Sequence, residues 1–402
     1  MKMLRVASLA ALCAVASTAG AVDMDIEAEF TPDATNPGAN RFVNKTESTG
    51  YCAIYPSQCT GNRFSLLVPI ETEFAAIDAG ARIENGAMIR VSNEPKTVEV
   101  VAEDGSLAQL TFTITHFGAN YNTSPSVQTI TGIPDNGLAH RGLWEGADWV
   151  NPAPECGYVG VGFLTPTRYT FFWTNRTGTA CGKVARFPIP SFNFNNFNIA
   201  YELATPNPLT MSNGTYTGSV TYTVGPGGDI DFGNRLQAND DTLTFNFTLK
   251  VNHILNISFP AGAHRLTLNP PGGWRHWLAS RQVPDKLIAH QDFRIWSSGQ
   301  FKMQLNCEYS AGEGCAIENK DGDRVALTTR VTLPSGLTGP AGPVKETPLS
   351  ETTPLLIDST HYVDNGRARL DFEVAHAGVE QMTGNAGTKY SGNVTVIWDG
   401  QI

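Results

Sequence analysis

Residues 22–30 read VDMDIEAEF, in which apolar side chains alternate without a fault with acidic ones. Successive side chains of a strand point to opposite faces of a sheet, so this alternation predicts a β-strand with one buried face. Helical periodicity is hard to find elsewhere, and other segments also have strand character. These segments are 110–114, 242–249, 325–333, 369–374 and 393–398. The sequence therefore predicts an all-β protein.

Turn-forming clusters separate the predicted strands. The chain contains 39 Gly and 24 Pro, and these gather in runs at 226–229, 270–273 and 339–343. Short strands joined by such turns favour antiparallel β-sandwiches of immunoglobulin-like or jelly-roll type. The segment 192–198 begins with a two-residue period that slips at Asn195-Asn196, which predicts a bulged strand.

The amino terminus is typical of an export signal. Lys2 and Arg5 precede an apolar stretch from Val6 to Ala16, and Ala19 and Ala21 are small residues at a cleavage site. We therefore expect residues 1–21 to be a signal peptide and the mature chain to pass through the periplasm. Removal of Lys2 and Arg5 takes the formal net charge from −10 to −12.

Cleavage would also remove one of the seven cysteines and leave six, and an even number in an exported chain favours disulfides. Proximity favours local pairs over the other pairings that six cysteines allow. The expected pairs are Cys52 with Cys59, Cys156 with Cys181, and Cys307 with Cys315.

The length of the chain predicts two domains, because about 380 residues exceed what one core usually serves. We expect a first domain at 22–225, a linker at 226–239 and a second domain at 240–402. A weak internal repeat supports a boundary of this kind, since the segment 214–221 resembles 387–395 with one insertion. Two similar closing strands would explain the repeat equally well.

Signatures of catalysis are missing from the sequence, so we expect no enzyme and no cofactor. The chain has no Gly-x-Ser-x-Gly, His-Glu-x-x-His or phosphate-loop motif. A cysteine–histidine zinc pattern is also absent, and Arg330 stands where a calcium loop starting at Asn319 would need a glutamate. The acidic net charge without a basic cluster argues against nucleic acid.

Binding residues are expected in a Gly- and Asn-rich region of the first domain. Sugar recognition needs a flat apolar platform with fixed polar groups around it. The tryptophans could offer the platform, although they could equally be core anchors. The candidates are Asn120, Tyr121, His140, Arg141, Trp144, Glu145, Asp148 and Trp149.

The carboxyl-terminal segment 390–399 resembles the closing strand of chaperone–usher pilins, which often carries Tyr-x-Gly-x-Val before an apolar alternation. The segment 241–251 resembles the first strand of such pilins. Near the mature start, the segment 50–59 resembles two-domain tip adhesins of the alternate chaperone–usher type, and so does 208–218. Residues 400–402 depart from the pattern, because such chains often end sooner after this strand.

This resemblance implies a pilin domain that lacks its last strand and receives one from a neighbouring subunit. An unpaired, apolar edge is prone to aggregation, and strand addition by a partner covers it. The implied partners are a periplasmic chaperone, an outer-membrane usher, an adjacent pilin subunit, and a surface receptor on a host, with a glycan as one candidate. The expected groove residues are Phe245, Phe247, Val394, Val396 and Trp398.

The function expected from all of this is a fimbrial tip adhesin exported to the cell surface. The alternatives are a structural or initiator pilin subunit without a receptor, and a free secreted β-sandwich enzyme or carbohydrate-binding protein. The strand at 22–30 has two possible roles, as a donor strand for another subunit or as the first strand of the adhesive domain. A closed edge beside 394–398 would exclude the fimbrial account.

Overall fold

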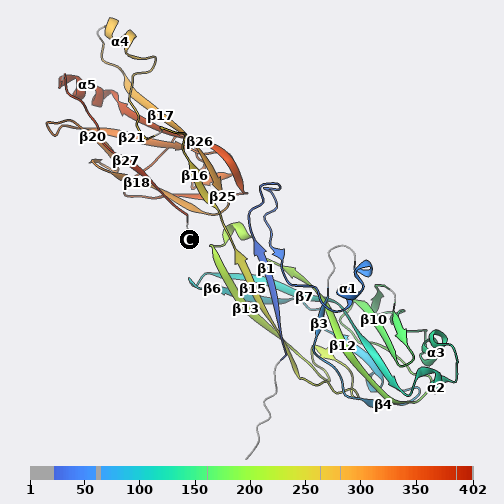
Figure 1. Cartoon of the computed structure of the whole chain (residues 1–402). Helices are drawn as coiled ribbons and strands as arrows, with labels where there is room; N and C mark the ends of the chain where they lie inside the picture. Colours follow the sequence, from blue (N-terminus) through green and yellow to red (C-terminus); the bar gives the residue numbers. More distant parts are fainter. Residues whose placement is uncertain are drawn as a thin grey trace, which may run out of the picture.

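The protein is almost wholly β-structure, as the sequence predicted (Figure 1). The structure is a computed structural model that describes residues 22–59, 65–160, 162–262, 264–280, 282–385 and 387–400. The expected signal peptide, residues 1–21, lies outside the described residues. No helix among the described residues combines the length and apolar character that a membrane crossing requires.

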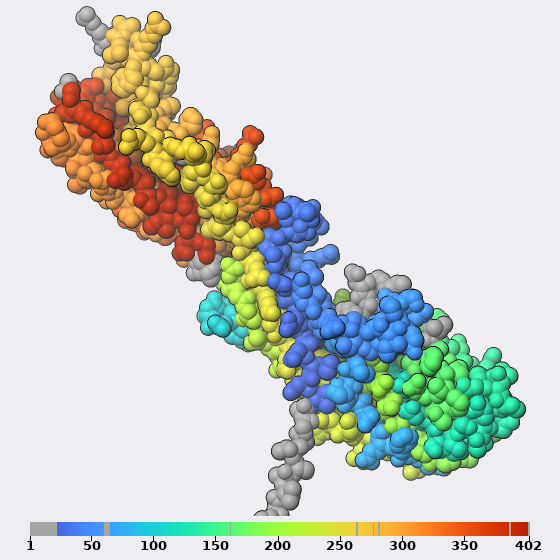
Figure 2. All heavy atoms as spheres, in the orientation of Figure 1, coloured from blue at the N-terminus to red at the C-terminus, as the bar shows by residue number. Residues whose placement is uncertain are grey.

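The sheets form two sets, which we call the first unit (residues 22–251) and the second unit (residues 255–400). Among the described residues, no strand ladder joins the two units. Each unit has its own hydrophobic core, with Phe112 and Phe245 in the first and Phe293 and Met303 in the second. The units lie end to end and give the molecule an elongated shape (Figures 1 and 2).

Among the described residues, the first unit contains fifteen strands, eight of which form the path β2-β1-β15-β13-β6-β7-β10-β8 of its main sheet. The bounds are β1 Val22–Phe30, β2 Val43–Asn44, β3 Leu66–Val68, β4 Ala75–Ile77, β5 Ala87–Val91, β6 Lys96–Ala102, β7 Leu107–Ser124, β8 Cys156–Tyr158, β9 Phe163–Thr165, β10 Arg168–Asn175, β11 Cys181–Lys183, β12 Ile189–Ala204, β13 Gly214–Thr223, β14 Ile230–Asp231 and β15 Thr242–Val251. Its described residues also form three short α-helices: α1 Tyr51–Ile54, α2 Val127–Thr131 and α3 Asn136–Leu143.

The second unit contains two sheets, with orders β16-β17-β26-β21-β20-β19 and β23-β22-β25-β18-β27. The bounds are β16 Leu255–Ser258, β17 Lys286–Ser297, β18 Phe301–Cys307, β19 Ser310–Ala311, β20 Gly314–Glu318, β21 Arg324–Thr332, β22 Leu337–Gly339, β23 Gly342–Pro343, β24 Thr347–Pro348, β25 Leu355–Ser359, β26 Val363–Ala375 and β27 Val394–Asp399. The helices are α4 Trp274–Ser280 and α5 His376–Gly384.

The expected domain boundary needs a correction, because residues 226–239 are not a linker. Ile230, Phe232 and Leu236 are buried in the first core, and β14 pairs with β5. β15, which was expected to open the second domain, pairs instead with β13 and β1 of the first unit. The stretch after Val251 is where strand pairing changes from one unit to the other.

β1 is the first strand of the first unit. Of the two roles considered for residues 22–30, the strand therefore has the second one within this chain. It pairs in parallel with β15, from Val22 opposite Leu243 to Phe30 opposite Val251. Ile26, Ala28 and Phe30 face the core, as the alternation predicted. In this structure the strand is therefore used inside its own unit.

The predicted bulge in β12 is confirmed. The pairing of β12 with β7 shifts register between Asn195 and Asn198, and Asn196 has a φ of 50°. Asparagine tolerates this left-handed conformation better than most residues, so the extra residue fits at small cost.

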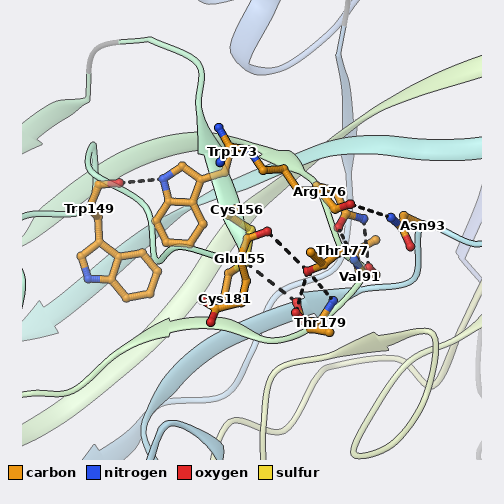
Figure 3. Close-up of a disulfide and its surroundings, with 12 residues drawn as sticks. Val91, Asn93, Trp149, Glu155, Cys156, Trp173, Arg176, Thr177, Thr179 and Cys181 are labelled. Atoms are coloured by element: carbon orange, nitrogen blue, oxygen red, sulfur yellow. Dashed lines mark hydrogen bonds between the residues drawn. A yellow bond between two sulfur atoms is a disulfide. The ribbon is translucent and has the colours of Figure 1, made fainter.

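All three disulfides expected from proximity are present: Cys52–Cys59, Cys156–Cys181 and Cys307–Cys315. Cys156–Cys181 joins β8 to β11 beside Trp149 and Trp173 and closes the longest of the three loops (Figure 3).

Loss of the Cys156–Cys181 disulfide is expected to destabilise the first unit. A cross-link restricts the unfolded chain, and removing a native disulfide from an exported domain typically costs about 2–5 kcal/mol. Urea unfolding of the chain with and without reductant measures the difference. The Cys156→Ser/Cys181→Ser variant, measured without reductant, should lower the midpoint of the same transition, and reductant should lower it further only by the contribution of Cys52–Cys59. Equal unfolding midpoints in every sample would contradict the prediction.

Candidate strand-acceptor groove

The second unit has two edge strands that face each other across its sandwich. Among the described residues, β27 pairs only with β18 and β16 pairs only with β17, so each strand ends its sheet. A Cβ added to Gly400, just after β27, would lie 3.0 Å from Leu255 of β16. The carboxyl end of β27 and the start of β16 therefore converge near the first unit.

Apolar side chains of both edges line the space between them. In β27, Val394, Val396 and Trp398 turn toward the core and are half-buried, whereas Ile397 between them is exposed. In β16, Leu255 and Ile257 are likewise half-buried and pack against the same core. We call this apolar surface between β16 and β27 the acceptor groove.

Aromatic contacts fix the end of the groove nearest the first unit. The Trp398 ring lies edge-on to Phe293, with 5.1 Å between the ring centroids, and 6.1 Å from Phe301. Phe259, just after β16, packs on Phe293 at 5.3 Å and keeps 37% of its surface exposed. The base of the groove is therefore packed around Phe293, whereas side chains at its sides, such as Phe259, remain partly exposed.

The groove residues expected from the sequence fall into two groups. Val394, Val396 and Trp398 pack against the second core from β27, and their role in a groove stays a prediction. The expectation for Phe245 and Phe247 is wrong, because both belong to β15 and are buried in the first core against Phe112. The opposite wall is β16, whose alternation at 255–259 is too short to compete with the ten-residue pattern of β15.

The internal repeat provides a comparison within the same chain. The repeat aligns the first part of β13 with residues 387–395, which lead into β27, so that Val220 corresponds to Val394. Gly218 and Gly392 occupy equivalent places, and a Cβ on either would meet backbone oxygen of a neighbouring strand, at 2.3 Å and 3.0 Å respectively. Both positions therefore favour glycine for the same reason of close approach.

The two copies of the repeat differ in their neighbouring strands. β13 has neighbours on both sides, β6 and β15, and β15 lies between β13 and β1. β27 has β18 on one side, and no described strand lies between it and β16. Among the described residues, the second unit therefore has no strand at the position that β15 fills in the first unit.

Four of the residues expected to bind a receptor are core residues instead. Tyr121, His140, Trp144 and Trp149 are each 0% exposed. Trp149 stacks on Trp173 at 5.1 Å (Figure 3). The structure therefore contradicts the expectation that Trp144 and Trp149 form an accessible platform. Both tryptophans anchor the core instead, which was the alternative.

Hydrogen bonds connect the other buried members of this group. The indole N–H of Trp144 donates to the Tyr121 hydroxyl at 3.2 Å, and that hydroxyl contacts His140 Nδ1. His140 Nε2 lies 2.7 Å from the carbonyl oxygen of Thr165, so Nε2–H donates there and Nδ1 accepts from Tyr121. Burial lowers the pKa of His140, which keeps the ring neutral and stabilises this chain of hydrogen bonds.

The remaining candidates are separated from one another. Arg141 and Glu145 are exposed near the end of α3, and Asp148 accepts a 2.7 Å hydrogen bond from Asn151. Asn120 lies on another face, where it lines a cavity of about 120 Å³. The structure therefore does not bring the eight expected receptor residues into one site. Among the described residues, no cluster of metal-ligating side chains appears.

Comparisons with known proteins found neither a matching family model nor a significantly matching curated sequence. Among solved structures, one similar to this chain is the chaperone–tip adhesion subunit pre-assembly complex, CsuC–CsuE, from archaic chaperone–usher pili of Acinetobacter baumannii. It has 8% identity and a TM-score of 0.22, and the alignment covers 94% of this chain and 98% of that one. Another is the CupB6 tip adhesin of Pseudomonas aeruginosa, with 7% identity, a TM-score of 0.24, and 85% and 86% coverage.

The first of these structures contains a tip adhesion subunit of chaperone–usher pili, and the second is a tip adhesin. TM-scores this low do not establish a common arrangement, so a function for this chain has to rest on its own strand pairing.

Proposed function

We propose that this protein is the tip adhesin of a chaperone–usher fimbria, in which the second unit is completed by a donor strand and the first unit attaches to a surface receptor. The observation that carries the proposal is the acceptor groove between β16 and β27. Its walls expose apolar side chains in a two-residue period, beside a strand edge with free main-chain groups among the described residues. An incoming strand would gain main-chain hydrogen bonds from that edge and bury its own alternate side chains.

An exported chain with such an edge needs a partner before assembly, because uncovered strand edges promote aggregation. A periplasmic chaperone would fill the groove first, and the strand of an adjacent pilin subunit would replace it at the usher. The complete first unit uses β1 for its own sheet, which leaves this strand no role as a donor and favours the tip over the shaft. The place for this protein is thus the exposed end of a surface fimbria.

The first unit supports the adhesive part of the proposal through its position. It lies on the side of the second unit where the acceptor groove ends, and its α2 and α3 lie at the far end of the molecule (Figure 1). In a fimbria that continues from the second unit, α2, α3 and the loops around them would lie farthest from the fimbrial shaft. Loops carried on a rigid sandwich commonly serve recognition.

Two matched substitutions in β27 test the groove. Val396→Asp places a charge on the inward face, where burial by a donor strand would strip its water, and it should reduce recovery of the chaperone complex at least tenfold. Ile397→Asp changes the neighbouring residue, which is 43% exposed, and should leave the complex intact. Co-purification of tagged chain with the chaperone of its own assembly system measures both. Equal recovery of the two variants would refute the groove, as would soluble, monomeric wild-type chain at full yield without any chaperone.

A further inference from the structure

The outer face of three strands in the first unit is unusually rich in side-chain amides. Strand register places Asn122 of β7 opposite Asn193 of β12, and Asn120 opposite Asn195. Their sequence neighbours Tyr121, Phe192 and Phe194 are fully buried in the core on the other face. The amides therefore share the face that is turned away from that core.

Hydrogen bonds hold several of these amides in fixed orientations. Asn122 donates to Asn193 Oδ1 at 2.9 Å, and Asn193 donates to the carbonyl oxygen of Thr72 at 3.1 Å. Thr170 of β10 donates to Asn120 Oδ1 at 2.6 Å. Side chains fixed in this way lose little further freedom when a ligand binds, which lowers the entropic cost of binding.

One polar atom on this face, the buried Asn195 Oδ1, has no hydrogen-bond partner among the described residues. Most buried polar atoms in proteins are satisfied, and an exception needs a reason. A polar group supplied by a ligand or by solvent would satisfy it.

Asn122, Asn193 and Asn195 line a groove of about 680 Å³, a size typical of ligand sites, whereas Asn120 lines the separate cavity of about 120 Å³. The segment 71–74 forms its opposite wall, held to β12 by the 2.8 Å hydrogen bond from Thr72 N to the carbonyl oxygen of Phe194. Glu71 and Glu73 contribute carboxylates from this wall, and Phe74 contributes a ring that is 61% exposed. The described lining contains no lysine or arginine.

We propose that this groove binds a neutral oligosaccharide. Amides, hydroxyls and carboxylates can between them donate to and accept from sugar hydroxyls, and the exposed face of Phe74 can stack on the apolar face of a sugar ring. The two uncompensated carboxylates disfavour sialylated or sulfated sugars by charge repulsion. A cationic peptide would satisfy only the carboxylates and would leave the amide row unused. The inference rests on the proposed function, since it names the receptor class for the adhesive unit.

Binding of the purified full chain to immobilised neutral oligosaccharides tests the inference, with sialylated and sulfated counterparts and an oligolysine peptide on the same surface. Phe74→Ala and Glu73→Gln are the informative variants, because both side chains are exposed and neither makes a hydrogen bond to another described residue. Each should weaken neutral-glycan binding about tenfold, equivalent to about 1.4 kcal/mol. Leu107→Ala, at a similarly exposed apolar residue at the other end of β7, is the matched control and should bind as the wild type does.

Three outcomes would overturn the inference: binding of oligolysine alone, binding restricted to anionic glycans, or neutral-glycan binding that both groove variants leave unchanged. Absence of binding to every probe would overturn it as well. None of these results bears on the proposal that the acceptor groove receives a donor strand. That proposal fails separately, if the chain folds without a chaperone.

Discussion

A donor strand fused after Ile402 is expected to raise the melting temperature of the second unit by at least about 10 °C. The first unit shows what this strand should look like, because β15 fills the equivalent place with Leu243, Phe245, Phe247, Leu249 and Val251 all turned inward. A fused segment with the same alternation, joined by a short turn, can add to β27 and cover the acceptor groove.

The size of the effect follows from burial. Fully burying one large apolar side chain stabilises a protein by about 1.5–3 kcal/mol, and the half-buried Val396, Trp398 and Leu255 would gain as well. Ordering the added strand offsets much of this gain, at about 1–2 kcal/mol per residue for the backbone. Main-chain hydrogen bonds along the added strand, at about 0.5–1.5 kcal/mol each, offset most of that ordering cost. A net gain of several kcal/mol therefore remains, which corresponds to about 10 °C or more in a unit of this size.

The control is a fusion of equal length in which serine replaces each inward apolar residue. It offers the same main-chain groups without the side chains that fill the groove. Scanning calorimetry of the two fusions and the unmodified chain compares their transitions. If the apolar fusion melts with the unmodified chain, the second unit is already complete and the fimbrial proposal fails.

The sequence predicted the class of fold because alternation is a local property. The faultless pattern of 22–30 and the slip at Asn195-Asn196 each reflect side chains a few residues apart, and both appear in the structure as expected. The disulfides follow for a similar reason, since each joins cysteines close together in the sequence.

The domain boundary could not be predicted in the same way because it depends on which strands pair across long separations. The pattern of 242–251 shows a strand buried on one face, but it does not show that the partner is β1, more than two hundred residues earlier. A run of Gly and Pro at 225–228 resembles a linker, although it is only the turn before β14. The candidate receptor residues failed for a related reason: Trp144 and Trp149 occur in a glycine-rich region, and only the tertiary packing buries them.

A fragment of residues 22–225 is expected not to fold, whereas a fragment of residues 22–253 should fold cooperatively. The shorter fragment lacks β15, whose five inward side chains are each 1% exposed or less. At about 1.5–3 kcal/mol for each, their loss costs roughly 10 kcal/mol, which is comparable with the total stability of a typical domain, about 5–15 kcal/mol. It also leaves β1 and β13 without the strand that joins them.

Urea unfolding followed by tryptophan fluorescence distinguishes the two fragments, because Trp144, Trp149 and Trp173 are all buried in the first unit. The longer fragment should show a single sigmoidal transition and a blue-shifted native spectrum, and the shorter one should emit as unfolded chain in buffer. In the longer fragment His253 also packs edge-on against Phe30, with ring centroids 5.4 Å apart, and closes the end of the core. Cooperative unfolding of residues 22–225 would show that the first unit is complete without β15. The comparison between β13 and β27 would then lose its basis, because the first unit would no longer define the strand that the second unit lacks.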